Sequence, residues 1–220
     1  MIRQPFRAAS LLAALLAACA TAPKPAATDA GGTTSQADAV QTSKVASEAN
    51  QTVAGQPGPG EEVETLDLNG DHKPDAYNFY PKGSLSRDGK PKTGAGGDAP
   101  RLLRKEIDLN GDGKIDMWKW YGQDGSVVRE AFDLDYDGKV DVIAYYEKGV
   151  IIREELFHGF SDKPDEYKYY EKGKLTRVEY DRNHDGHIDE WDYWENGAID
   201  RIGYDDDGDG NVDRWEKAKK

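Results

Sequence analysis

The sequence predicts an all-β fold, an antiparallel meander of 24-residue β-hairpin repeats joined by acidic loops and preceded by a disordered tether. Nine-residue acidic segments recur from residue 108 onward at intervals of 25, 24, 24 and 24 residues. A glycine stands near the middle of each stretch between them. Apolar and polar side chains alternate around that glycine, which is the period-2 pattern of strands with one buried face.

Each stretch between two acidic segments fits a pair of strands and a tight turn. About 15 residues are available, too few for two helices and a turn but enough for two strands of five or six residues. Trp191 and Tyr193 alternate with Asp192, as expected of a half-buried strand. The pairs Lys172-Gly173 and Asn196-Gly197 favour tight turns. We therefore expect turns along one edge of the sheet and acidic loops along the other.

Residues 1–18 have the layout of a secretory signal peptide. Arg3 and Arg7 precede an apolar run that is too short to cross a bilayer as a permanent helix. The run ends in Leu16-Ala17-Ala18-Cys19, which resembles the lipobox of bacterial lipoproteins. The resemblance implies that Cys19 becomes a lipid-modified N-terminus anchored in a membrane. Ala20 stands where an Asp retains enterobacterial lipoproteins in the inner membrane, which implies the outer membrane, on its periplasmic face or at the cell surface.

Residues 19–62 are predicted to form the lipidated cysteine and a disordered tether. They are rich in Ala, Thr, Gly, Pro, Ser and Gln and contain no aromatic residue, so they bury too little apolar area to offset their ordering entropy. A flexible tether of this length spans roughly 35 Å; a short Ala-rich helix around Ala46 is the alternative. Residues 63–220 form the predicted repeat domain, interrupted by an insertion at 88–100 that we expect to be a mobile loop.

The acidic loops have the ligand spacing of a calcium site. Calcium takes about 6–8 oxygen ligands, which a nine-residue loop supplies from side chains at positions 1, 3, 5 and 9 and a carbonyl at position 7, with a glycine turn at position 6. The predicted side-chain ligands are Asp67, Asn69, Asp71 and Asp75; Asp108, Asn110, Asp112 and Asp116; Asp133, Asp135, Asp137 and Asp141; Asp181, Asn183, Asp185 and Asp189; and Asp205, Asp207, Asp209 and Asp213. The predicted carbonyl ligands belong to Lys114, Lys139, His187 and Asn211, and Glu216 is a further candidate at position 12 of the last loop.

These loops resemble those of EF-hands, dockerins, thrombospondin type 3 repeats and integrin-type FG-GAP repeats. An EF-hand also needs a Glu at position 12, on the helix that leaves the loop. In the four best loops that position holds Lys119, Ala144, Asp192 and Glu216, so only the last one matches. The 24-residue spacing of the predicted hairpins resembles that of repeats of the MORN type, although the glycine signature of those repeats is missing. The resemblance to EF-hands therefore extends to the loop and not to its flanking helices.

Two acidic segments depart from the pattern. The first loop has His72 where the glycine is expected, which predicts weaker binding. The segment 157–165 begins with Phe157 and has Gly159 at position 3, so we expect it to hold no ion. We expect packed side chains to occupy the space that an ion takes in the other loops. His184 and His187 suggest a zinc pair as an alternative, which is disfavoured because His187 occupies the position that uses only its carbonyl. Magnesium is disfavoured because it demands near-octahedral geometry.

Two further rows of residues repeat with the loops. An arginine stands four residues before each of five loop starts, either to orient the acidic side chains or to bind a ligand. These arginines are Arg104, Arg129, Arg153, Arg177 and Arg201. The abundant aromatics form either the core of the sheet or an exposed stacking platform.

Composition limits the function classes. The net charge of −13 becomes −15 without residues 1–18, which argues against nucleic acid as a partner and favours cations. No HExxH, GxSxG or P-loop motif is present, so we do not expect an enzyme. We expect a calcium-binding envelope lipoprotein that acts as a calcium-stabilised structural or adhesion module, with an envelope protein or a polysaccharide as partner. The alternatives are a calcium buffer or sensor and a glycan-acting hydrolase.

Overall fold

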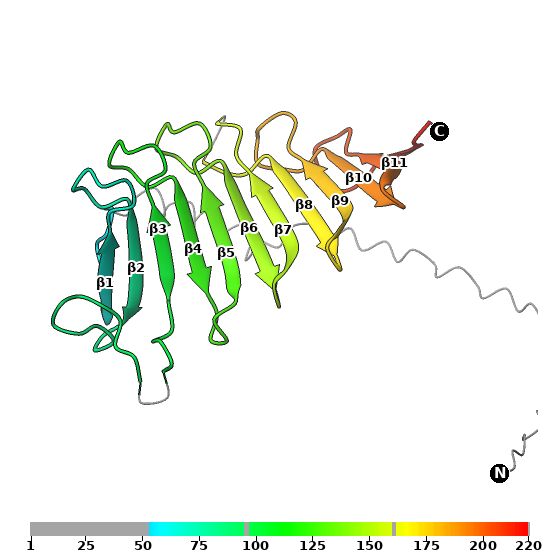
Figure 1. Cartoon of the computed structure of the whole chain (residues 1–220). Helices are drawn as coiled ribbons and strands as arrows, with labels where there is room; N and C mark the ends of the chain where they lie inside the picture. The colour runs from blue at the N-terminus through cyan, green and yellow to red at the C-terminus, as the bar shows by residue number, and fades with distance from the viewer. Residues whose placement is uncertain (1–52, 95–96, 160–161, 220) are drawn as a thin grey trace, which may run out of the picture. The chain divides into compact units, whose positions relative to one another are not determined.

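The computed structural model describes residues 53–94, 97–159 and 162–219. They form one 12-stranded antiparallel sheet whose strands lie side by side in sequence order, and they include no helix (Figure 1). This confirms the predicted all-β meander. Accordingly, the described part of the chain offers no helix long and apolar enough to cross a membrane. The predicted signal peptide, Cys19 and the tether up to residue 52 lie outside the described residues.

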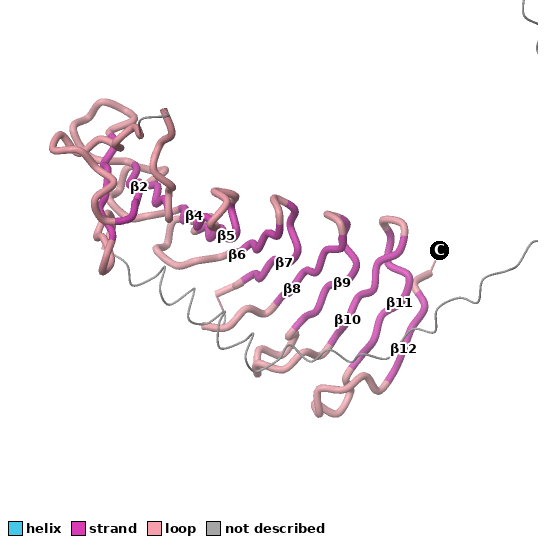
Figure 2. Tube along the Cα trace, turned by 90° about the horizontal axis from the view of Figure 1, so that it is seen from below, coloured by secondary structure: helices cyan, strands magenta, loops and turns pink. Residues whose placement is uncertain are grey.

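The strands are short, and each pairs with the next one along the chain (Figure 2). They are β1 (Glu61–Leu66), β2 (Ala76–Pro81), β3 (Arg104–Ile107), β4 (Met117–Tyr121), β5 (Val127–Phe132), β6 (Val142–Glu147), β7 (Val150–Leu156), β8 (Glu166–Glu171), β9 (Lys174–Tyr180), β10 (Glu190–Glu195), β11 (Ala198–Tyr204) and β12 (Arg214–Lys217).

The predicted tight turns close three hairpins, β6–β7, β8–β9 and β10–β11. In the β8–β9 hairpin Glu171 pairs with Lys174, which leaves Lys172 and Gly173 as the two turn residues. Their φ angles are 51° and 75°, and two positive angles in succession match the right-handed twist of the flanking strands. A bulge follows each of these turns, so that Tyr169 faces Arg177 across the hairpin.

The acidic loops stack along the opposite edge of the sheet, as predicted (Figure 1). The N–H of the first residue of each loop donates to the carbonyl of the last residue of the loop before it. Asp133 bonds in this way to Asp116 at 2.8 Å, and Asp205 to Asp189 at 2.9 Å. Successive loops are two strands apart, which corresponds to roughly 10 Å.

Most of the core lies on one face of the sheet, while Ala144 and Val178 are buried on the other face. Its central cluster contains Ile115, Trp118, Ala131, Val140, Ile143 and Phe157. Tyr167 and Trp191 are also buried on the same face, so these aromatics form the core rather than an exposed platform. Trp215 differs because it lies on the edge strand β12, where 42% of it is exposed.

The arginine row belongs to this core and not to the acidic loops. Each guanidinium lies over an aromatic ring of the neighbouring strand, for example Arg177 over Tyr169 at 4.2 Å and Arg153 over Tyr145 at 4.6 Å. Arg177 also pairs with Glu179, a buried glutamate on its own strand, at 3.1 Å. The expectation that these arginines orient the loop carboxylates is wrong, because four residues of strand place them roughly 13 Å from the loop.

The pairing of arginine and buried glutamate occurs in three of the repeats. Arg104 pairs with Glu106, Arg153 with Glu155 and Arg177 with Glu179, and all three glutamates are fully buried. Ala131 and Gly203 occupy the equivalent place beside Arg129 and Arg201.

The sheet begins slightly before the expected boundary at residue 63. β1 starts at Glu61, and residues just before it also contact the sheet. The N–H of Gly55 donates to Glu106 at 3.0 Å, and the guanidinium of Arg104 donates to the carbonyl of Gln56 at 3.0 Å. Near the insertion at 88–100, Leu85 and Pro91 form an isolated β-bridge.

Candidate metal centre

The five acidic loops share one backbone conformation, which the second loop illustrates. The carboxylate of Asp108 at position 1 accepts the N–H groups of Gly111 at 2.7 Å and Gly113 at 2.8 Å. The side-chain oxygen of Asn110 accepts the N–H of Asp112 at 2.8 Å, and the carboxylate of Asp112 accepts the N–H of Lys114 at 2.8 Å. The side chains at positions 1, 3 and 5 therefore hold the loop's own backbone in a tight curl.

Two positions of each loop have a left-handed backbone, although the sequence pattern predicted only one. Position 6 has positive φ at Gly113 (88°) and also at His72 (69°). Position 4 has positive φ as well, at Gly111 (79°), Tyr136 (65°) and His184 (61°). The signal for position 4 is the glycine that three of the five loops carry there.

In the third and last loops, three of the predicted carboxylates come together. Asp133, Asp135 and Asp141 each offer an oxygen within 4.8 Å of the others, and Asp205, Asp207 and Asp209 form a second such group. Carboxylates gathered in this way repel one another without a cation. A hard divalent ion that prefers oxygen ligands suits both groups.

The aspartate at position 9 closes each loop. In the second loop Asp116 accepts the N–H of Leu109 at 2.6 Å and that of Asn110 at 3.2 Å, both through Oδ2. Equivalent bonds reach Asp75, Asp141, Asp189 and Asp213 in the other loops. This explains why an aspartate stands at position 9 of every loop.

Two carboxylate oxygens of these loops are buried without a hydrogen-bond donor. They are Oδ1 of Asp116, a residue with 1% of its surface exposed, and Oδ1 of Asp133, with 2% exposed. A buried polar atom without a partner is costly, and a charged one more so. A bound cation would supply the missing partner, so the residues present fit a calcium ion in the second and third loops.

The electrostatics of the second loop point the same way. Burial raises the pKa of Asp116, and the nearby carboxylates of Asp108 and Asp112 raise it further, against the lowering effect of the two backbone N–H groups. Burial also raises the pKa of Asp133. These carboxyl groups are therefore harder to ionise in the folded chain, and a divalent cation would reverse that effect.

In two loops the asparagine at position 3 contacts the aspartate at position 9. The amide nitrogen of Asn69 donates to Asp75 at 3.2 Å, and that of Asn183 donates to Asp189 at 3.0 Å. These contacts bring positions 3 and 9 together in the first and fifth loops. The amide oxygen must turn inward to serve as a calcium ligand there.

The remaining predicted ligands divide into two groups. Lys114, Lys139, His187 and Asn211 all donate their N–H groups to the position-5 carboxylate at 2.8 Å, which fixes the peptide at position 7 within the loop. Glu216 is not brought to its loop. It lies on β12, and its carboxylate pairs with Arg214 at 2.5 Å. A strand rather than a helix leaves the loop, so position 12 is carried away along the sheet.

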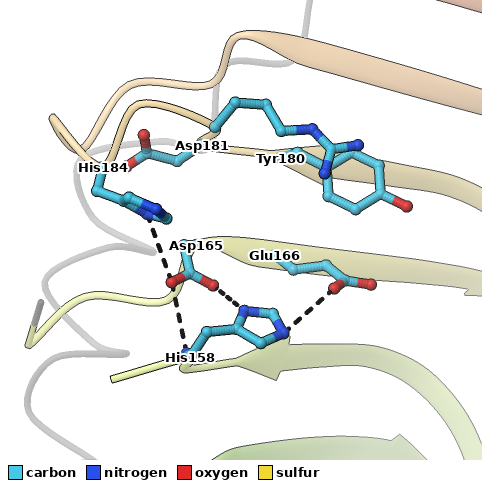
Figure 3. A pocket seen from close by; sticks show the side chains of 7 residues that line it. His158, Asp165, Glu166, Tyr180, Asp181 and His184 are labelled. Carbon is cyan, nitrogen blue, oxygen red and sulfur yellow. Dashed lines mark hydrogen bonds and ion pairs between the residues drawn. The ribbon is translucent and has the colours of Figure 1, made fainter. Parts of the chain in front are cut away.

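The degenerate segment 157–165 contains residues that the sequence reasoning missed. Phe157 packs in the core cluster, as expected of a place filled by packing. The imidazole of His158, however, lies between the carboxylates of Asp165 and Glu166, and His184 of the next loop points toward Asp165 (Figure 3). These side chains border a cavity of about 310 Å³. His184 thus lies against Asp165 of the neighbouring segment.

A sequence-family model described as EF hand matches residues 105–117, which contain the second loop. Together with the grouped aspartates, this match fits calcium-loop repeats. No curated protein matches the chain.

Several solved structures resemble parts of the chain at a low level. One is the Glycosylation Associate Protein (Gap123) complex from Streptococcus agalactiae, with a TM-score of 0.35 and 15% identity over 41% of this chain and 17% of that one. Another is accessory secretory protein 1, 2 and 3 of Streptococcus pneumoniae, with a TM-score of 0.32 and 12% identity over 63% of this chain and 20% of that one. The chain thus spans a fifth or less of those chains, and a likeness this low does not bear on function.

Proposed function

We propose that this chain is a calcium-binding envelope lipoprotein whose repeat sheet is a calcium-stabilised structural or binding module. The observation that carries the proposal is the pair of buried, donorless oxygens, Oδ1 of Asp116 and Oδ1 of Asp133. Both belong to loops whose other side chains have the spacing and the oxygen chemistry that calcium requires. The ion would join the two halves of each loop and thereby brace one edge of the sheet.

The proposed affinity is that of an extracellular calcium module. The position-12 glutamate that strengthens EF-hand sites is replaced in three of the four best loops, and Glu216 pairs with Arg214. The described residues contain no helix pair that calcium would open, which favours a structural role over a sensor. Dissociation constants on the order of 10⁻⁴–10⁻³ M are expected.

The location and the partner are part of the same proposal. The lipobox-like residues before Cys19 support an anchor in the outer membrane, and the tether composition supports a module held away from that surface. We propose an envelope protein or a polysaccharide as the partner and assign the chain no catalytic activity. The acidic character of the chain supports a partner other than nucleic acid.

A calcium titration followed by amide NMR tests the proposal loop by loop. Each position-6 glycine donates its N–H to the position-1 aspartate, as Gly210 does to Asp205 at 2.6 Å, so its amide signal reports on its own loop. The account predicts calcium-dependent shifts at Gly113, Gly138, Gly186 and Gly210. Unshifted glycine signals at about 10 mM calcium, well above the expected constants, would contradict it.

The last loop offers a matched pair of variants for the same titration. Asp205 is a predicted ligand, whereas its neighbour Asp206 pairs with Arg214 outside the loop at 3.1 Å. Asp205→Asn and Asp206→Asn remove the same charge from adjacent positions. The first should weaken binding at this loop at least about tenfold, since it deletes a carboxylate ligand, and the second should leave the Gly210 response nearly intact. Equal effects would show that general acidity, not ligation, attracts the ion.

A further inference from the structure

The segment 157–165 keeps one buried carboxylate after losing its other calcium ligands. Phe157 and Gly159 replace the residues that supply oxygens at positions 1 and 3. Asp165 remains at position 9 with 4% of its side chain exposed. The segment therefore cannot supply the oxygen set of the other loops, yet it still presents a carboxylate that needs positively charged or proton-donating partners.

Two imidazoles approach this carboxylate from two different loops. Nδ1 of His158 contacts Oδ1 of Asp165, and Nδ1 of His184 lies 3.7 Å from Oδ2 of the same residue (Figure 3). His184 occupies position 4 of its loop, one of the left-handed positions, with a φ of 61°. Stacking of the loops thus places a histidine of one repeat against the end of the previous repeat.

A second carboxylate lies behind one of the imidazoles. Nε2 of His158 is 3.7 Å from Oε2 of Glu166. Histidines that bind metals through one ring nitrogen commonly donate the other ring N–H to a carboxylate, which fixes the tautomer and the ring orientation. Glu166 is placed for that role once Nδ1 of His158 faces the ion.

We propose that His158, Asp165 and His184 form a transition-metal site, of the class that binds Zn²⁺, separate from the calcium loops. Two nitrogen donors and one carboxylate are typical of zinc, while calcium prefers oxygen ligands alone. Bonds of about 2.0–2.1 Å in a tetrahedral site place the ligand atoms roughly 3.3 Å apart. The 3.7 Å between His184 and Asp165 is close to that value, and the imidazoles of His158 and His184, which are 49% and 34% exposed, must turn toward a common point beside Asp165 to admit the ion. The adjoining cavity leaves room for water as a fourth ligand.

The charges around the cavity favour a cation. Asp165, Glu166 and the buried Asp181 line it, together with a single arginine, Arg182. The guanidinium of Arg182 pairs with Glu190 at 2.9 Å and lies over the ring of Tyr180 at 3.8 Å. Glu166 pairs with Lys168 at 3.2 Å, and Asp181 belongs to the next calcium loop. The carboxylate of Asp165, which the imidazoles contact, is therefore the one left to bind an ion in this space.

The test is a Zn²⁺ titration of the 220-residue chain by calorimetry, in about 10 mM calcium so that the calcium loops are filled. One ion per chain is expected. His158→Asn and His184→Asn should each weaken binding at least about tenfold, and Glu166→Gln about 10–100-fold, as for other outer-shell partners. His72→Asn is the matched control, because His72 is exposed and occupies position 6 of the first loop, which supplies no predicted ligand. Absence of stoichiometric zinc binding, or an equal loss in the control, would overturn the proposal.

A measurement on the unmodified chain keeps the test independent of folding of the variants. The chain has four histidines, so their ¹⁵N signals are few enough to resolve. Zinc should shift Nδ1 of His158 and His184 and leave His72 and His187 unchanged. Shifts confined to the other two histidines would refute the site. The glycine amides of the calcium loops report separately, so failure of the zinc site and failure of calcium binding are distinguishable.

Discussion

At the scale of single residues, the position-9 aspartate links the fold of a loop to its chemistry. Asp116 uses Oδ2 to accept two backbone N–H groups and leaves Oδ1 buried without a donor. One oxygen closes the loop whether or not an ion is present. The other oxygen, Oδ1, gains a partner only when a cation binds. Asp116 should therefore stabilise the calcium-bound form and destabilise the metal-free form.

This reasoning predicts opposite effects of Asp116→Asn in the two forms. Burial raises the pKa of Asp116 in the folded, metal-free chain above the unfolded value of about 3.9. The stability that this carboxyl group contributes is therefore fully present below about pH 3.9, where it is neutral in both states. That stability is lost as the pH rises through the higher pKa of the folded state. An amide does not titrate and still accepts both N–H groups. In metal-free buffer at pH 7 the variant should therefore be at least as stable as the parent, and in calcium it should be less stable.

Urea unfolding of both proteins from about pH 3.5 to 7 measures this difference. In metal-free buffer the advantage of the variant should shrink as the pH falls toward 3.9, where the parent's carboxyl group becomes neutral. If the variant changed stability equally in chelated and calcium-containing buffer, Oδ1 of Asp116 would not be a calcium ligand.

The spacing of the acidic residues predicted which carboxylates share a loop, and those of Asp133, Asp135 and Asp141 do lie together. It did not predict what surrounds the loops. His184 was considered with His187, its neighbour in sequence, yet its imidazole lies 3.7 Å from the carboxylate of Asp165. That contact depends on how neighbouring loops stack, which no pattern within one loop reveals.

At the scale of strands and turns, the hairpins combine a favourable glycine with an unfavourable lysine. Lys172 adopts a left-handed backbone with a φ of 51°, which costs a residue with a side chain roughly 1–2 kcal/mol. In the next hairpin Asn196 occupies the same position, and asparagine tolerates this conformation better.

We therefore predict that Lys172→Asn raises the free energy of unfolding by about 0.5–1 kcal/mol. Gly173→Ala should lower it by about 1–2 kcal/mol, since Gly173 also has positive φ. Chemical unfolding in saturating calcium gives both values, and Lys174→Ala, in the adjoining strand and exposed, serves as control. A neutral Gly173→Ala would mean that this turn does not limit stability.

The buried glutamates of the arginine row are a second feature at this scale. Glu179 is fully buried, pairs with Arg177 at 3.1 Å and accepts the phenol of Tyr169 at 2.8 Å. Removing one partner leaves the other charge buried without compensation. The sequence showed the arginines as a regular row, but regular spacing did not reveal that they face the aromatic core.

Glu179→Ala should accordingly lower the free energy of unfolding by about 3 kcal/mol. Glu147→Ala is the matched control, because Glu147 is exposed and meets Lys148 only at 3.9 Å. Thermal and urea unfolding of the two variants gives the comparison. Similar losses in both would show that the buried pairs add no more than an exposed pair, against our interpretation of the row.

At the scale of the whole sheet, the acidic loops lie in series along one edge. Successive loops are roughly 10 Å apart, close to the screening length of about 8 Å at physiological ionic strength. Repulsion between neighbouring loops is therefore only partly screened, and the chain already carries a net charge of −13. Each calcium ion would remove two of these charges and stabilise the edge on which the loops are stacked.

The measurement that tests the central claim most directly is thermal unfolding of the whole chain in chelator and at increasing calcium concentration. An ion that binds only the folded state stabilises that state at every occupied loop. At a hundred times the dissociation constant the gain in the free energy of unfolding is about 2.7 kcal/mol per site. Several sites should therefore raise the melting temperature steeply and continuously as the calcium concentration rises. A melting temperature that is the same in chelator and in millimolar calcium would contradict the account and reduce the acidic loops to ordinary turns.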